Sequence, residues 1–221
     1  MNVNKILVNS NIDIINSVND LTIESNKLNI NVYKESIIYI VNQNIEELII
    51  NMKDDSKLDI YIYNICNLKY IEINQTNNTV VNFNYSYINK SDNYLEVLNN
   101  IDGNNNKINI LIKNISSNGL SKIKVSAKVK NSSIDNYLNE SIKGIITNGL
   151  IEVDPIIICD SNYVEAFHSA SISGVDEGEI NYLMSKGLSY MISRKLIING
   201  FILSNMDYYI KNLDIGGEEY E

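Results

Sequence analysis

The sequence predicts a mainly β protein, built as a parallel β-helix that gives way to helices near its C-terminus. From Lys5 to about Ile158 the chain is a series of short runs in which apolar and polar residues alternate, as half-buried strands require. Asn, Asp and Ser separate the runs and supply turns. Helical periodicity begins only after Ser171, so we place a β-helix core in residues 1–171 and a helical segment in residues 172–221.

The number and spacing of the runs favour a β-helix over other all-β folds. About fifteen strands at intervals of 8 to 12 residues could form a sandwich, a barrel or a solenoid. A sandwich of this size would be large, whereas each coil of a β-helix uses short strands with inward β-branched residues and accepts Asn and Ser at its corners. Residues 9–21 come nearest to a helical pattern but read nearly as well as strands. The clearest strands are expected at residues 5–9, 28–34, 36–43, 58–65, 69–74, 79–88, 107–115, 121–130 and 143–153.

Three short helices are expected after Ser171. Asp176 and Glu179 form a capping box at the start of the first, and Gly187 is placed to end it. Ser189 can cap a second helix that runs to about residue 199 and stops at Gly200. A third is expected within residues 204–213. The residues expected to be buried are Ile180, Leu183 and Met184 in the first helix, Ile192, Leu196 and Ile197 in the second, and Met206, Ile210 and Leu213 in the third.

Charge and composition exclude several classes of partner. The chain has 18 Lys and Arg against 27 Asp and Glu, a net charge of -9, which argues against nucleic acid or an anionic membrane as the main partner. No apolar run approaches the roughly 20 residues needed to cross a bilayer, and the polar residues in the first stretch do not suit a secretory signal. The two Cys, far apart in sequence, suit a reducing cytoplasm.

The segment VEAFHSASISGVDEGEINYLMSKGLSYMISRKLIINGF, residues 164–201, contains the only His and carries a recognisable pattern. It resembles the C-terminal core of the SufB/SufD family, components of the SUF iron–sulfur cluster assembly machinery. In that family a last β-helix strand leads through a His to small residues, and two helices follow that close on Gly-Phe. The matching residues here are Val164, His168, Ala170, Ser171, Tyr182, Leu183, Ser185, Gly187, Gly200 and Phe201.

The resemblance implies a fold, partners and a site. The fold would be a right-handed parallel β-helix whose C-terminal helices dock an ABC-type ATPase, SufC. Two such subunits, as a homodimer or a heterodimer with a homologue, would pair with cluster chemistry near their interface, and any iron–sulfur cluster would be transient. This chain differs from the family where Lys186 replaces the usual Arg, where Ser169 replaces a Glu of many SufB members, and where Ala166 replaces a Cys of some members. It also resembles a reduced version of the family, since the N-terminal helical region is not recognisable.

His168 is the first candidate ligand, since neutral imidazole is a good donor to iron and the resemblance places it at the assembly interface. Alternatively it forms a hydrogen bond across a subunit contact. Cys159 follows an apolar run and is expected in a buried strand, as a thiolate ligand or as a small apolar side chain. Cys66, in an alternating run, has the same two interpretations. Neither belongs to a CxxC, so a cluster site would have to be shared between two chains or completed by carboxylates.

Two further surfaces are candidates. Acidic residues surround the only Pro, and Glu152 and Asp154 could form a hard-metal or general acid/base pair, although such residues are commonly a solvated face. The other members of this acidic set are Asp160 and Glu165. The helices could dock a partner through exposed side chains, or they could cover the open end of the β-helix. The docking candidates are Tyr182, Lys186, Tyr190 and Met191.

No phosphate-binding loop and no nucleophile motif is present in the sequence, so we expect a non-catalytic chain that does not hydrolyse ATP itself. The favoured function is a scaffold or partner subunit in iron–sulfur cluster assembly, acting with a SufC-like ATPase. One alternative is a β-helix polysaccharide hydrolase or lyase that uses the carboxylates near Asp154 and Asp160. Another is a structural subunit of a SUF-like complex that binds no metal.

Overall fold

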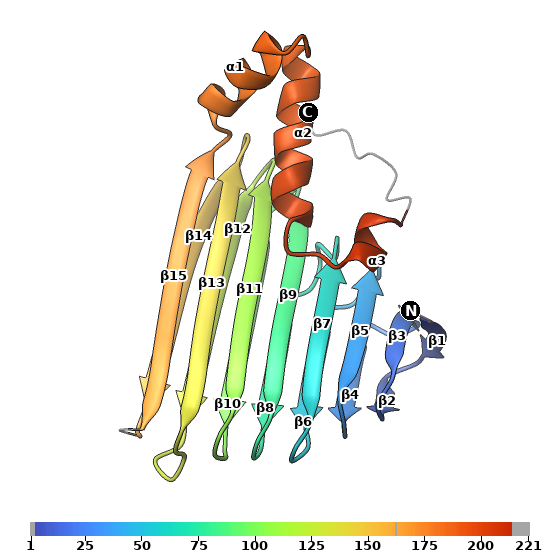
Figure 1. The fold of residues 1–221 in the computed structure, drawn as a ribbon, viewed down its shortest axis with the longest axis vertical. Coiled ribbons are helices and arrows are strands. Elements are labelled where there is room, and N and C mark those ends of the chain that lie inside the picture. The colour runs from blue at the N-terminus through green and yellow to red at the C-terminus, as the bar shows by residue number, and fades with distance from the viewer. Residues whose placement is uncertain (1–2, 162, 214–221) are drawn as a thin grey trace.

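The computed structural model describes residues 3–161 and 163–213, and within these ranges the chain forms fifteen strands and three helices (Figure 1). The strands alternate between two sheets. Sheet A contains β1 (Asn4–Val8), β3 (Val18–Ile23), β5 (Ser36–Val41), β7 (Lys57–Tyr63), β9 (Val80–Asn89), β11 (Lys107–Ser116), β13 (Asn136–Ile146) and β15 (Val164–Gly174). Sheet B contains β2 (Asn11–Ile14), β4 (Lys27–Val32), β6 (Glu47–Met52), β8 (Tyr70–Gln75), β10 (Asn93–Ile101), β12 (Leu120–Val129) and β14 (Leu150–Cys159).

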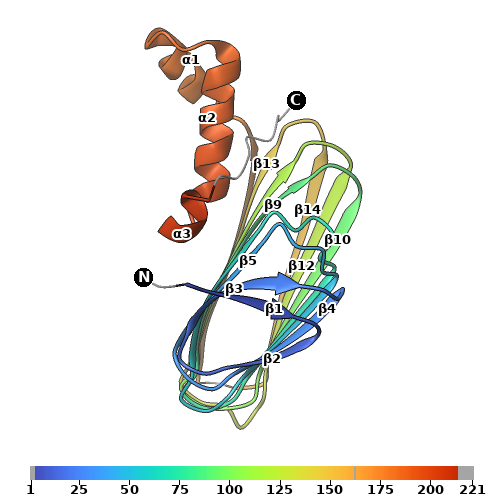
Figure 2. The ribbon, with the colours of Figure 1, turned by 90° about the vertical axis from the view of Figure 1, so that its right-hand side faces the viewer.

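Each consecutive pair of strands, one from each sheet, forms one rung of a flattened solenoid (Figures 1 and 2). Within each sheet the chain returns to the same side after two strands, so neighbours are parallel throughout, as in β11 beside β13 and β10 beside β12. The predicted parallel β-helix with a small C-terminal helical region is confirmed. The strand region continues to Gly174, three residues past the expected change at Ser171.

The solenoid interior is filled by columns of apolar side chains. Because parallel partners in register point to the same face, one residue of each strand stacks on the next at the strand spacing of about 4.8 Å. One such column in sheet A contains Ile38, Ile60, Phe83 and Ile110, each buried to 1% exposure or less. Each fully buried side chain of this size contributes roughly 1.5–3 kcal/mol, so the repeated columns supply the main stabilisation.

Asn and Asp residues hold the corners. Asn42 and Asn64 stand at equivalent corners of successive rungs with φ of 52° and 55°, and the Asn64 amide donates to Asn42 Oδ1 at 2.9 Å. Asp55, Asn78 and Asn105 repeat the arrangement at the other end of the strands, with side-chain bonds of 2.8 and 3.0 Å between successive members. Asn and Asp tolerate the left-handed backbone that these corners require. The expectation of Asn at corners is therefore confirmed.

Two stretches differ from the predicted boundaries. The strand expected at residues 143–153 is wrong, because a turn at residues 147–149 divides it between β13 and β14. There the backbone of Gly149 passes close to the preceding rung, with the Gly119 carbonyl oxygen 2.6 Å from where a Cβ would lie. The ambiguous stretch 9–21 contains β2 and the start of β3, and its residues Ile12, Ile14 and Leu21 pack in the same solenoid core.

The helices are α1 (Glu177–Ser185), α2 (Tyr190–Leu203) and α3 (Tyr208–Lys211). Asp176 caps α1 as predicted, since its Oδ1 accepts from the backbone amides of Gly178 and Glu179 at 2.7 and 3.1 Å. Ser189 caps α2, accepting from the Ile192 amide at 3.3 Å. Gly187 follows α1 with φ of 95°, in the left-handed region that suits a helix end.

Several details of the helices were predicted wrongly. Gly200 lies inside α2, because the helix continues for three more residues to Leu203. The buried face of α2 consists of Ser193, Ile198 and Ile202, while Ile192 and Leu196 are 51% and 50% exposed. Met184 of α1 is also exposed. The third helix is one turn long, and the part of the helical segment in residues 214–221 lies outside the described residues.

The helices pack on the outer face of sheet A and do not cover the end of the solenoid. Ile198 and Ile202 of α2, with Met206 and Ile210 beyond it, bury against the outward side chains of Tyr39, Tyr63, Ile88, Ile115 and Ile145. Figure 2 shows α2 and α3 beside the sheet, with α1 standing beyond the ends of the strands. The interpretation of the helices as a cover for the open end is therefore wrong.

Candidate functional site

The last rung of the solenoid has an uncovered edge. In the part of the chain that the structure describes, β15 pairs with β13 alone and β14 pairs with β12 alone, so each is the outermost strand of its sheet. Nearly all of β15 is exposed, and Tyr163 and Phe167 are 68% and 53% exposed. An uncovered strand edge with apolar side chains is a ready surface for another chain.

At this end the column of sheet A contains ionisable side chains in place of apolar ones. It runs through Phe83 and Ile110, and its next two members are Glu140 on β13 and His168 on β15. Register partners share a face of the sheet, and Glu140 lies between buried Leu138 and Ile142, so both ionisable side chains are on the inner face. The packing of Val164 and Ala166 against the core supports the same assignment for alternate residues of β15.

Glu140 is a buried acid whose carboxylate has no hydrogen-bond partner among the described residues. It is 0% exposed, and neither carboxylate oxygen has a hydrogen-bond partner among residues 3–161 and 163–213. Burial raises the pKa of Glu140 to about 7, because the apolar surroundings disfavour the charged form. An uncompensated carboxylate is costly for folding, so its position beside the only His indicates a binding role.

His168 lies on the inner face of β15 and is exposed, because no other strand of the described ranges pairs with the outer edge of β15. The imidazole stands in the next position above Glu140, at roughly the 4.8 Å spacing between strands. One nitrogen donor and one carboxylate at this separation can hold a single transition-metal ion between them. Glu140 was missed from sequence, although an acid between Leu138 and Ile142 in an alternating run is a detectable signal.

The two Cys do not join this pair. Cys159 was expected in a buried strand, and it is instead exposed at the end of β14, with its Sγ 3.1 Å from the Ser161 carbonyl oxygen. His168 lies four residues into β15 from Val164, about 13 Å along the strand from that end. Cys66 is exposed in the turn after β7, not in a strand, and its Sγ donates to the Ile88 carbonyl oxygen at 3.1 Å.

The acidic set around Pro155 is dispersed. Glu152 and Asp154 are exposed on the outer face of β14 with Lys122 and Lys124 as register partners, and Glu152 pairs with Lys122 at 3.5 Å. Glu165 is exposed at the start of β15. A carboxylate held beside a Lys on an open face has the features of a solvated surface.

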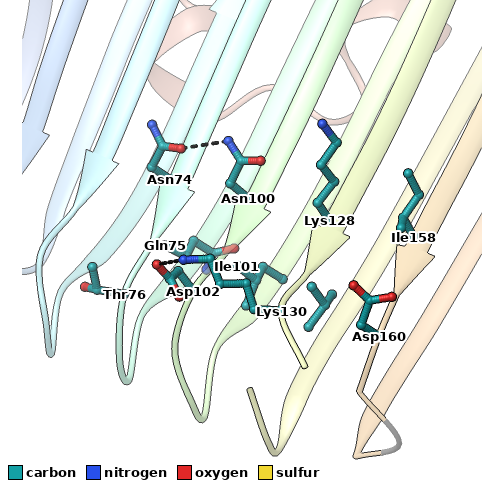
Figure 3. Close-up of a pocket in the computed structure, with 11 residues that line it drawn as sticks. Asn74, Gln75, Thr76, Asn100, Ile101, Asp102, Lys128, Lys130, Ile158 and Asp160 are labelled. Atoms are coloured by element: carbon teal, nitrogen blue, oxygen red, sulfur yellow. Dashed lines mark hydrogen bonds and ion pairs between the residues drawn. The ribbon is translucent and has the colours of Figure 1, made fainter. Parts of the chain in front are cut away.

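Asp160 lines a hollow of about 600 Å³ at one end of sheet B, together with residues of β8, β10 and β12 (Figure 3). Asn100 donates to Asn74 at 2.9 Å there, and Lys130 forms an ion pair with Asp102. Because Asp102 is already paired, Asp160 has no second free carboxylate in this hollow with which to act as an acid/base pair. Within residues 3–161 and 163–213, the carboxylates named for the hydrolase alternative, Asp154 and Asp160, are therefore not brought together as a pair in this hollow.

The four docking candidates lie together on α1 and the start of α2. Tyr182, Tyr190 and Met191 are 62%, 44% and 62% exposed, and the Lys186 amine lies 5.2 Å from the centre of the Tyr182 ring. Met184, Ile192 and Leu196 of the same two helices are also exposed, which the sequence did not predict. We call the seven residues the arm surface. Exposed apolar residues concentrated on a projecting element are typical of a protein interface.

A complete metal site is not formed by one chain. Among the described residues, no group of three or more His, Cys, Asp or Glu side chains is close enough to hold a metal ion. Glu140 and His168 therefore make at most half of a site, and a second chain at the open edge would have to add the rest. In the same residues no helix is long and apolar enough to span a membrane.

Fold and site together define a β-helix subunit with an ionisable end rung and a projecting helical arm. Comparison with known proteins identifies its class. The SufBD core domain of the SUF system for FeS cluster assembly matches residues 43–201, and the chain belongs to this family. The iron–sulfur cluster assembly protein SufD of Bacillus subtilis (strain 168) is 32% identical over 88 residues, which are 38% of this chain and 18% of that protein. The match therefore spans less than a fifth of the relative's length.

Proposed function

We propose that this chain is a non-catalytic subunit of a SUF-type assembly complex, whose end rung holds iron or a nascent iron–sulfur cluster between two paired subunits. The observation that carries the proposal is the Glu140–His168 pair, in which a buried carboxylate with no hydrogen-bond partner among the described residues is the register partner of the only His in the sequence. Iron accepts both donors, and a second chain across the open edge would complete its coordination. Cluster and iron are here the cargo of the complex.

The partner chains of the proposal follow from the two exposed surfaces. The uncovered edge of β14 and β15 would pair with a second copy or a homologue, adding strand contacts or an end-to-end stack. The arm surface would dock a SufC-like ATPase, since the family membership and the exposed Tyr and Met side chains favour such an interface. A cytoplasmic setting agrees with a sequence whose two cysteines, Cys66 and Cys159, lie far apart along the chain.

Anaerobic reconstitution tests the site. The wild-type chain and His168→Ala are incubated with ferrous iron and sulfide, desalted, and compared by visible absorption and bound iron. Retention of iron and charge-transfer absorption by the wild type, reduced at least tenfold in His168→Ala, supports the proposal. Ser169→Ala is the matched control, because Ser169 is the exposed neighbour on the opposite face of β15. A wild type that retains no iron favours the purely structural subunit.

A further inference from the structure

The helical arm, Glu177–Lys211, is attached to the solenoid at both of its ends, and the two attachments are of different kinds. Its beginning is continuous with β15 through Val175 and Asp176. Its other end, the junction of α2 and α3, is held against the outer face of sheet A by hydrogen bonds. Between these attachments α1 packs mainly on α2, and the arm surface is exposed.

Lys113 of β11 forms the central contact of the junction. The side chain is covered by α2, leaving the residue 6% exposed. Its ammonium donates to the Phe201 carbonyl oxygen at 2.8 Å and to Ser204 Oγ, and it lies 4.8 Å from the centre of the Phe201 ring. The last carbonyls of a helix carry partial negative charge and are not all satisfied by the helix's own amides, so a side chain of β11 that donates to the Phe201 carbonyl ties this helix end to the sheet.

Three more polar contacts join the same junction to other strands of sheet A. Ser86 of β9 donates to Asn205 Oδ1 at 3.0 Å. Tyr39 of β5 donates to Asp207, and Tyr209 donates to Asp20 of β3 at 2.7 Å. The junction is thus tied to β3, β5, β9 and β11, and Lys113 is the member nearest the end rung.

The position of Lys113 in the register connects the arm to the candidate site. Lys113 lies three residues beyond Ile110 on β11, about 10 Å along the strand, and Ile110 is the register partner of Glu140. The arm is therefore joined to the strands of the candidate site in two ways. It is continuous with β15, and it is bonded through Lys113 to β11, the strand that pairs with β13.

We propose that Lys113 is a positioning residue that pins the arm to β11, so that a partner docked on the arm surface moves β15 relative to the neighbouring strands and alters the spacing of Glu140 and His168. The partner-driven step rests on the proposed function. The pin itself does not, because it is a property of the isolated chain.

Hydrogen–deuterium exchange of the full chain tests the pin. Lys113→Met removes the hydrogen-bond donor while keeping an unbranched apolar stem, and Lys113→Arg retains a donor. We expect exchange in residues 201–213 to rise at least tenfold in Lys113→Met and less in Lys113→Arg, with residues 164–174 unchanged. Lys128→Met, at an exposed lysine of β12, is the matched control. Ser204→Ala removes one acceptor and decides the question if Lys113→Met does not fold. If residues 201–213 exchange in the folded variant at the same rate as in the wild type, Lys113 does not hold the arm against β11.

Addition of a SufC-like ATPase tests the transmission. In the wild type, the bound ATPase is expected to change exchange in residues 107–116 and 136–146. In Lys113→Met the ATPase is expected to bind with unchanged affinity, because the arm surface is intact, while that change is lost. If the ATPase changes exchange in residues 107–116 and 136–146 of Lys113→Met as much as in the wild type, Lys113 does not transmit the effect of the partner. Failure of the ATPase to bind the wild type overturns the proposed partner and the partner-driven step together, while exchange of the isolated chain still decides the pin.

Discussion

Glu140 and His168 are register partners on β13 and β15, and they form the ionisable end of a column whose earlier members are apolar. The solenoid would be more stable if the apolar column continued, since a buried carboxylate without a partner opposes folding. The retention of an acid one rung inside the open end is therefore best explained by binding. On the proposed function, a second chain that covers the edge would complete the site.

Glu140→Gln should stabilise the isolated chain. At pH 8, above the pKa of about 7, the wild type buries a charged carboxylate that the amide replaces. We expect the free energy of unfolding in urea to rise by about 1–3 kcal/mol. Glu152→Gln, on the exposed face of β14, should change stability by less than about 0.5 kcal/mol. A loss of stability in Glu140→Gln would show that the carboxylate is compensated in the folded chain.

Two glycines should respond to substitution in opposite directions. A Cβ on Gly103 would lie 2.3 Å from the Thr76 carbonyl oxygen of the preceding rung, so Gly103→Ala should cost about 1–3 kcal/mol. Gly200 lies within α2 with nothing within 4 Å of its added Cβ, so Gly200→Ala should gain up to about 1 kcal/mol of helix stability. Thermal unfolding measures both. Equal effects of the two changes would contradict the close rung packing described here.

Lys113 should make stability depend on pH between about 8 and 10. Burial, with smaller effects of Lys143 and Lys211, lowers the pKa of Lys113 to about 8 from the ordinary 10.5. In this window the unfolded chain keeps a proton that the folded chain has lost, so stability rises with pH and the penalty is fully present below pH 8. From pH 7.5 to 10 we expect the wild type to gain on the order of 1–3 kcal/mol relative to Lys113→Met, measured by urea unfolding.

Two half-buried tyrosines, Tyr70 and Tyr209, change the pH dependence of stability in the opposite direction to Lys113. Burial raises the pKa of Tyr70 and Tyr209 to about 12, so the stability they provide is lost as pH rises above the ordinary tyrosine value near 10. Both proteins contain these tyrosines, and their effect cancels in the difference. A difference between wild type and Lys113→Met that stays constant from pH 7.5 to 10 would contradict the buried amine.

Tyr190→Asp combined with Met191→Asp should weaken association with a SufC-like ATPase at least a hundredfold. Each side chain is exposed on the arm surface, and a charge at a central interface position costs about 2 kcal/mol or more. The matched control is Leu7→Asp with Ile15→Asp, at residues 64% and 61% exposed near the other end of the solenoid. Co-purification measures both. If the first pair binds as the control does, the docking surface lies elsewhere.

The fold could be predicted because its signal is repeated. Alternation in runs such as residues 58–65 and 107–115 specifies an inner and an outer face, and Asn and Asp at the corners accept the required left-handed backbone. The face of α2 could not be predicted in the same way. Apolar residues occur on more than one side of this helix, so periodicity alone did not decide between Ile192 and Ile198. The outer apolar face of sheet A decides it.

The site was predicted in part. The family pattern located His168, but nothing local shows which strand is the last, and the exposure of Cys159 depends on that fact. Glu140 belongs to a run that reads as an ordinary strand, and its significance comes from stacking under His168, 28 residues further along the chain. Contacts between rungs are a property of the register, which no single strand specifies.

X-ray absorption at the iron edge tests the central claim most directly. Wild type, His168→Ala and Ser169→Ala are loaded anaerobically with ferrous iron alone, and the outer-shell scattering of an imidazole is measured together with bound iron. We expect imidazole scattering in the wild type and in Ser169→Ala, with loss of that scattering and at least tenfold less iron in His168→Ala. Iron bound equally by all three, without an imidazole signal, would contradict it.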